Sequence, residues 1–165
     1  MEPDQTARTT ELLNTVVRIL TRLMGTYGCW AITGSANLAL RGVQIIPSDI
    51  DIITTCETAD HFSLLTKNIA PLEFRLSEND TIQSYYAKMK LHGFPIDVMA
   101  NPVILTKDGT WQKLDFWYDS VEFVQTTIGL VPLTSLEFEY YVYSLLGIGD
   151  RVKIIDSQLR ESRQP

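Results

Sequence analysis

Two short apolar segments, each joined to polar residues at a defined place, constrain this chain more than any other feature. The first segment, residues 29–33, runs directly into the pair Gly34-Ser35. Thirteen residues then separate Ser35 from Asp49, where the second segment begins. Both segments are rich in residues that favour strands. Side chains two residues apart in a strand lie on the same face, so Asp49 and Asp51 are expected to project together from a sheet while the isoleucines beside them enter a core.

This pair of acids needs something to balance its charge. Two carboxylates held close together repel each other, and a cation, a shared proton or open water relieves the repulsion. A divalent metal ion that also holds a phosphate is the hypothesis against which we read the rest of the sequence.

A predicted hairpin supplies a third carboxylate. Residues 83–91 alternate between apolar and polar side chains, His92-Gly93 suits a tight turn, and residues 94–100 suit the return strand. With a two-residue turn, Lys88 falls opposite Asp97 on the face that points away from the core. A slip of one residue would bury the lysine, so the pattern favours this register.

The rest of the chain predicts a single domain of the α/β (α+β) class, with a small mixed sheet flanked by helices and a helical C-terminus. The catalytic core of this domain is expected over about residues 10–100, and a C-terminal hairpin with helices over about residues 120–160. Thr58 and Ser135 are expected to cap helices. Helices are expected over residues 10–25, 36–41, 58–68 and 136–145 and from about residue 150, a turn at 77–80, an irregular stretch over 101–119, a second hairpin over 121–127 and 130–133, and a frayed tail over 160–165.

Charge and cysteine content narrow the function classes. The net charge of −6 disfavours a nucleic-acid partner without excluding one, and no apolar run is long enough to predict a membrane span. The acidic, polar N-terminus does not resemble a secretory signal. Cys29 and Cys56 lack the spacing of a zinc site, and we expect both thiols to be buried and reduced in a cytoplasmic protein.

Several other polar and aromatic residues have an ordinary structural interpretation beside a functional one. Trp111 and Trp117 are expected to cover the core, and stacking on a base is the alternative. Glu137 and Glu139 are expected on a helix surface. The alternative is that one of them acts as a general base toward a molecule that accepts a transferred group. Lys153 is expected to be solvated or to touch a triphosphate.

The Gly-Ser pair, the Asp-x-Asp pair and the later aspartate together resemble the nucleotidyltransferase superfamily typified by DNA polymerase beta. The small size of the chain suggests its minimal branch and its antibiotic-modifying branches, such as the lincosamide and aminoglycoside nucleotidyltransferases. The resemblance implies that Gly34 and Ser35 bind the triphosphate, that Asp49 and Asp51 coordinate magnesium, and that Asp97 completes a second metal site and helps to deprotonate the acceptor.

The resemblance covers about residues 29–100 and implies transfer of a nucleoside monophosphate from a nucleoside triphosphate, such as ATP, to a hydroxyl acceptor. One or two Mg²⁺ ions would serve, Lys88 would contact phosphate, and a small molecule is the favoured acceptor. Two alternatives stay open: a non-catalytic module of a toxin-antitoxin type of pair, and the same chemistry on a protein or tRNA. The short C-terminal part suggests that a homodimer or protein partner completes the acceptor site.

Overall fold

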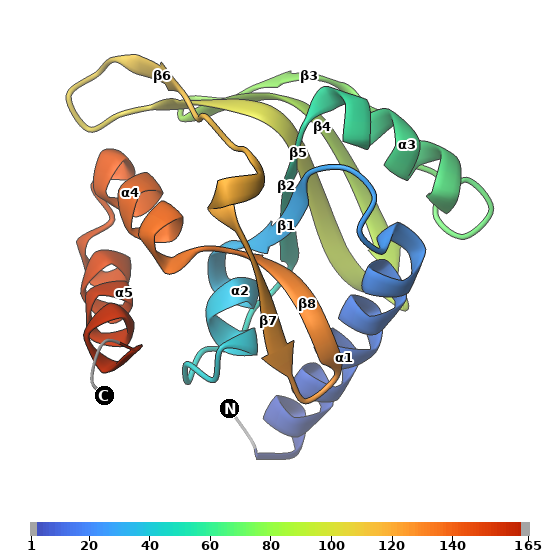
Figure 1. Cartoon of the computed structure of the whole chain (residues 1–165). Coiled ribbons are helices and arrows are strands. Elements are labelled where there is room, and N and C mark those ends of the chain that lie inside the picture. The colour runs from blue at the N-terminus through green and yellow to red at the C-terminus, as the bar shows by residue number, and fades with distance from the viewer. Residues whose placement is uncertain (1–2, 163–165) are drawn as a thin grey trace.

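A mixed eight-stranded sheet organises residues 3–162, which are the part of the chain that this computed structural model describes (Figure 1). The strands follow the order β3-β4-β5-β2-β1-β8-β7, and β6 pairs with β5 outside this path. β2 runs parallel to β5, and β1 runs parallel to β8, whereas the other pairs are antiparallel. The strands are β1 (Trp30–Thr33), β2 (Ile50–Thr54), β3 (Arg75–Glu78), β4 (Ile82–Leu91), β5 (Phe94–Leu105), β6 (Trp111–Lys113), β7 (Val121–Thr126) and β8 (Gly129–Thr134).

Five α-helices and one 3₁₀ turn in the described part of the chain accompany this sheet. In Figure 1, α1 and α3 lie to the right of the sheet and α4 and α5 to its left. None of these helices combines the length and the apolar character that a membrane crossing requires. The helical elements are α1 (Pro3–Met24), α2 (Gly34–Leu40), α3 (Cys56–Thr66), α4 (Leu136–Leu146), α5 (Gly149–Ser162) and the 3₁₀ turn η1 (Tyr118–Ser120). The expected mixed α/β class is confirmed.

Strand alternation divides the sheet into two faces. Ile32, Ile50 and Ile96 point to one face and are fully buried in the core cluster that includes the apolar side of α1. The residues between them point to the other face, where a second cluster forms with Phe138 of α4. Asp51 lies on this second face, opposite Ile50 and Ile52 as predicted, whereas Asp49 precedes β2.

The hairpin register is confirmed. β4 and β5 pair Leu91 with Phe94 and Lys88 with Asp97, and the turn residues His92 and Gly93 have φ angles of 52° and 81°. Two successive positive φ angles are typical of the tight turn that matches the twist of two antiparallel strands.

Some helix boundaries differ from the predictions. α1 begins at Pro3, seven residues before the predicted start. Thr55 caps α3, because its hydroxyl oxygen accepts a hydrogen bond from the backbone N–H of Thr58 at 3.3 Å, so the predicted cap at Thr58 is wrong. Ile69 lies past the end of α3 and is exposed. Ser135 caps α4 as predicted.

Strand boundaries also differ. The stretch predicted to be irregular contains the end of β5, all of β6 and η1, because β5 pairs first with β4 and then with β6. Residues 77 and 78 belong to β3 and not to a turn. α5 continues to Ser162, so the predicted fraying is wrong for 160–162, and residues 163–165 lie outside the described residues.

Candidate active site

Asp51 lies between two residues on the neighbouring strands of the sheet. It pairs with Thr33 on β1 and with Asp97 on β5. Adjacent strands are about 4.8 Å apart and their side chains share the pleat, so the two aspartates lie side by side on one face of the sheet. Asp49 immediately precedes β2 and lines, with Lys88 and Asp97, a hollow of about 440 Å³.

The protonation of Asp51 reflects this crowding of acids. Burial, and after it the charges of Asp49, Asp97 and Glu139, raise the pKa of Asp51 from 3.8 to about 7, and Lys88 opposes the rise. A carboxyl group in such surroundings gains from any cation that enters. The site is therefore short of positive charge near neutral pH.

Asp97 receives two donors on one of its oxygens. The hydroxyl of Tyr86 donates to Oδ2 of Asp97 at 2.8 Å, and Nζ of Lys88 lies 3.3 Å from the same oxygen. The Lys88 side chain is 68% exposed, so it can turn toward a ligand without unpacking the core. The second oxygen of Asp97 takes part in neither contact.

Gly34 brings the backbone close to the carboxylate of Asp51. Its φ angle is +71°, and a Cβ atom added there would lie 3.0 Å from Oδ2 of Asp51. Both facts require glycine, because a side chain disfavours positive φ and would crowd the acid. Ser35 is the second residue of α2, and it does not line the cavity of about 560 Å³ that Gly34 and Asp51 line.

Glu139 is the buried acid that sequence reasoning placed wrongly on a helix surface. It is 1% exposed, and its Oε1 accepts hydrogen bonds from three elements. The donors are the Thr33 hydroxyl at 2.6 Å, the Gly34 N–H at 2.9 Å, the Asn37 amide at 3.0 Å and the Thr134 hydroxyl. Because one oxygen accepts all four, Glu139 ties α4 to the turn that carries Gly34.

Helical spacing offered a signal for this burial. Glu139 shares a helix face with Val142, Tyr143 and Leu146, which lie three, four and seven residues further on and line the same cavity. The neighbouring Glu137 is exposed, as predicted.

The exposure of two tryptophans and of Lys153 can be compared with the predictions made for them. Trp111 and Trp117 are 44% and 58% exposed, so the expectation that they cover the core is wrong. Lys153 is exposed and lies 3.6 Å from a carboxylate oxygen of Asp150.

A cavity of about 560 Å³ lies between the acidic face of the sheet and α4. Its size suits a small-molecule ligand. Asp51, Asp97 and Lys88 line it together with Arg75 and Tyr143, which sequence reasoning missed. Burial raises the pKa of the Tyr143 hydroxyl to about 12, with Glu139 and Asp51 adding to the rise, so this hydroxyl stays a hydrogen-bond donor at neutral pH.

The donor set suits a hard divalent cation. Among the side chains that the structure describes, no three from His, Cys, Asp or Glu are arranged as a ready-made metal cage. Magnesium seldom uses such a cage, because it keeps several waters and binds through one or two carboxylates together with substrate phosphates. Asp51 and Asp97, side by side and short of positive charge, fit that mode of binding.

Comparisons with known proteins concern the whole fold. No protein-family model matches this sequence, and a search by sequence among curated proteins gives no match. Among solved structures, a "putative nucleotidyltransferase (TM1012) from Thermotoga maritima" is 27% identical, with a TM-score of 0.67 over 98% of this chain and 96% of that one. The chain has the nucleotidyltransferase fold.

Two antibiotic-modifying enzymes share the nucleotidyltransferase fold with this chain. ANT(2")-Ia, solved with adenylyl-2"-tobramycin, is 11% identical, with a TM-score of 0.57 over 90% of each chain. The lincosamide antibiotic adenylyltransferase LnuA, solved with lincomycin, is 14% identical, with a TM-score of 0.55 over 86% of this chain and 94% of that one. The resemblance to this superfamily drawn from the sequence is therefore confirmed at the level of the fold.

Proposed function

We propose that this protein transfers a nucleoside monophosphate from a nucleoside triphosphate to a hydroxyl group of a small molecule, with a divalent metal ion and with release of pyrophosphate. The observation that carries the proposal is the register of β2 and β5, which sets Asp51 beside Asp97 in a cavity next to Gly34. The similarity in fold to nucleotidyltransferases supports the same reaction class.

The carboxylates would hold the metal ion. Asp51 and Asp97 offer side-by-side oxygens, and Asp49 adds a third acid at the adjoining hollow. Bound magnesium would neutralise the triphosphate and stabilise the charge that develops on the leaving pyrophosphate.

The other residues of the site would bind, orient and deprotonate. Lys88 is exposed enough to leave Asp97 and contact a phosphate, and Arg75 lines the same cavity. Tyr86 holds Oδ2 of Asp97, which leaves the second oxygen to accept the proton of the acceptor hydroxyl. The oxygen of that hydroxyl would bond to the α-phosphorus as the bond to pyrophosphate breaks. Ser35 remains a candidate phosphate contact at the start of α2.

ATP is the first nucleotide to test, because LnuA is an adenylyltransferase and ANT(2")-Ia was solved with an adenylylated product. The assay measures pyrophosphate release from each nucleoside triphosphate with Mg²⁺, using lincomycin, tobramycin, other polyhydroxylated small molecules, and RNA as acceptors. The expected result is release that requires both an acceptor and the metal.

Variants connect the activity to the site. Asp51→Asn and Asp97→Asn should each lower the rate by about 10³-fold or more, since each removes a charged ligand from the reacting centre. Asp60→Asn, at an exposed position on α3, should leave the rate unchanged. Full activity in either site variant, or neither nucleotide binding nor turnover with any acceptor, would show that the carboxylates do not act in this way.

A further inference from the structure

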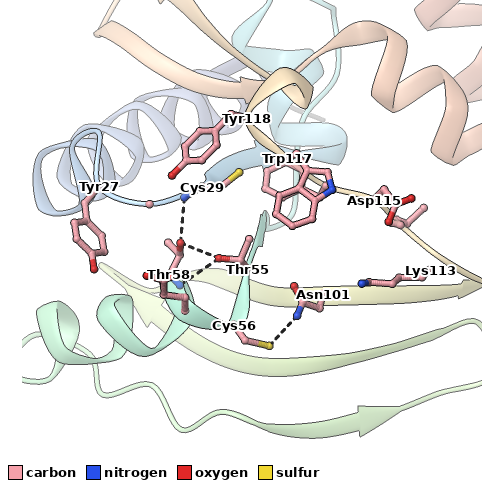
Figure 2. A pocket seen from close by; sticks show the side chains of 14 residues that line it. Tyr27, Cys29, Thr55, Cys56, Thr58, Asn101, Lys113, Asp115, Trp117 and Tyr118 are labelled. Carbon is pink, nitrogen blue, oxygen red and sulfur yellow. Dashed lines mark hydrogen bonds between the residues drawn. The ribbon is translucent and has the colours of Figure 1, made fainter.

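A second cavity lies at the opposite end of β1 and β2 from Asp51. It has a volume of about 480 Å³ and is lined at Cys29, just before β1, and at Thr55, just after β2 (Figure 2). The proposed active site lies at the other ends of these strands, where Thr33 pairs with Asp51. The two cavities share no lining residue, so the second one is a separate feature.

The topology of the sheet creates this cavity. The parallel pairing of β2 with β5 ends at Thr54 and Ala100. β2 then leads into α3, while β5 carries one extra residue between the pairs that Ala100 and Val103 make with β4. The segment after β2 and the rest of β5 diverge beyond this β-bulge. The resulting crevice lies where the parallel pairing of β2 with β5 ends, next to Asn101 within β5.

One wall of the cavity presents aromatic rings to solvent. Trp117 and Tyr118 line it and are 58% and 68% exposed, and Figure 2 shows both on the side opposite Asn101. The preceding residue, Phe116, is buried and packs edge-on against Phe138, with ring centroids 5.8 Å apart. The buried ring anchors the segment, so the Trp117 indole is held as a stacking surface.

The other wall offers an amide. Asn101 sits in the bulge with a φ angle of +49°, a conformation that few residues other than glycine adopt and that is common at functional positions. Its Nδ2 donates to Sγ of Cys56 at 3.1 Å. Among the described residues no other hydrogen bond to this side chain is recorded, so its carbonyl oxygen and second amide hydrogen are free to bind a ligand.

The charged side chains that line this cavity favour an uncharged ring over an anionic ligand. Glu57 and Asp115 line the cavity together with a single cation, Lys113. An anionic ligand would meet a net negative lining, whereas an uncharged ring meets an aromatic surface and an amide with both a donor and an acceptor. An asparagine amide pairs well with the N6/N7 edge of adenine.

We propose that this cavity binds an uncharged planar heteroaromatic ring of the purine-nucleoside type, stacked on Trp117 and hydrogen-bonded at one edge by Asn101. The site does not depend on the proposed transfer reaction, because none of its residues lines the active-site cavity.

The test measures adenosine binding to the full chain by calorimetry, without metal or triphosphate. Trp117→Leu should weaken binding by about 10- to 100-fold, the usual effect of removing an aromatic side chain on which a base stacks. Asn101→Gly removes the amide and keeps a residue suited to positive φ, and it should weaken binding by about tenfold or more. Trp111→Leu is the matched control, since Trp111 is also exposed but does not line the cavity.

A second readout places the ligand. Cys56 is half-buried and lines the cavity, whereas Cys29 is buried and its pKa is raised to about 11 by burial and by Asp119. A thiol reagent should therefore label Cys56 first, and adenosine should slow this labelling. AMP, which adds negative charge, should bind more weakly than adenosine.

Each contrary outcome overturns the proposal. Absence of adenosine binding up to about 10 mM, equal losses in the Trp117 and Trp111 variants, or binding that neither responds to Trp117→Leu nor protects Cys56 would each do so. The last outcome would place the nucleoside elsewhere, for example in the active-site cavity. Asp51→Asn should leave adenosine binding unchanged, so this result is independent of the pyrophosphate-release assay.

Discussion

Replacing Asp51 by asparagine should stabilise the metal-free protein, and the gain should grow with pH. Burial and the neighbouring acids raise the pKa of Asp51 to about 7 in the folded protein, whereas its ordinary value is 3.8. The folded state therefore holds a proton that the unfolded chain releases. The structure thus predicts a cost of ionisation that asparagine, which cannot ionise, avoids.

The sign and size of the effect follow from linkage. Between pH 3.8 and about 7 the folded state binds more protons at this position than the unfolded state. The contribution of Asp51 to the free energy of unfolding therefore falls as pH rises through this range and is level above it. One unit of pKa shift corresponds to 1.36 kcal/mol, so the shift of about three units costs the wild type up to about 4 kcal/mol above neutral pH.

Urea unfolding followed by circular dichroism, in the presence of EDTA, measures this cost at pH values from about 4 to about 8.5. The quantity to plot is the free energy of unfolding of Asp51→Asn minus that of the wild type, since the other titrating groups cancel in this difference. The difference should rise through the acidic range and level off above about pH 7. Asp60→Asn, at an exposed position, should give a difference near zero throughout.

A difference that stays constant across this range would refute the reasoning, because it would mean that Asp51 ionises as easily in the folded as in the unfolded chain. If the reasoning holds, adding Mg²⁺ with a triphosphate above pH 7 should stabilise the wild type more than Asp51→Asn, since a ligand that binds only the folded state adds to its stability.

Three further changes test the supports of the site. Glu139→Ala should lower the free energy of unfolding by about 2–4 kcal/mol, because it removes the acceptor of the buried Gly34 N–H and of the Thr33 hydroxyl. Glu137→Ala, at an exposed position, should change it by less than about 0.5 kcal/mol; thermal and urea unfolding measure both. Gly34→Ala should lower it by about 2 kcal/mol or more through strain at positive φ and crowding against the adjacent acid. Gly42→Ala, also at positive φ but with no atom within 4 Å of the added Cβ, should show only the strain. Lys88→Met should raise the KM for the triphosphate by about tenfold with little loss of stability, because an exposed ion pair contributes at most about 1 kcal/mol, and steady-state kinetics measures the change.

The outcomes that would contradict these expectations are distinct. Equal losses in the two glutamate variants would mean that the hydrogen bonds to Oε1 do not stabilise the fold. Equal losses in the two glycine variants would mean that the approach of Gly34 to its neighbouring acid is not tight. A KM unaffected by Lys88→Met would remove this lysine from phosphate binding.

Residues close in sequence were the ones whose arrangement could be predicted. The alternation of residues 83–91 and the His92-Gly93 turn were enough to pair Lys88 with Asp97, because a two-residue turn and a period of two leave one register that buries the apolar side chains. The cap of α4 at Ser135 was local in the same sense. By contrast, the cap of α3 shifted from Thr58 to Thr55, since both residues suit a cap.

Residues far apart in sequence required the tertiary structure. The pairing of Asp51 with Asp97 depends on a parallel contact between β2 and β5, which no turn dictates. Glu139 was misplaced because its four donors come from β1, α2 and β8, three elements whose positions relative to α4 the sequence does not give. The second cavity was not foreseen, because a bulge in β5 opens it.

The amino-acid sequence by itself determined which side chains face a core and which face outward, since alternation and helical spacing are properties of the local backbone. It thereby also named the three acids and the glycine of the candidate site. Only the tertiary structure decided that Asp51 and Asp97 share one cavity, that a buried glutamate from α4 holds the glycine turn in place, and that burial and neighbouring acids raise the pKa of Asp51. The physical reason is that charge interactions and burial depend on distances through space, and those distances are set only when distant strands pair.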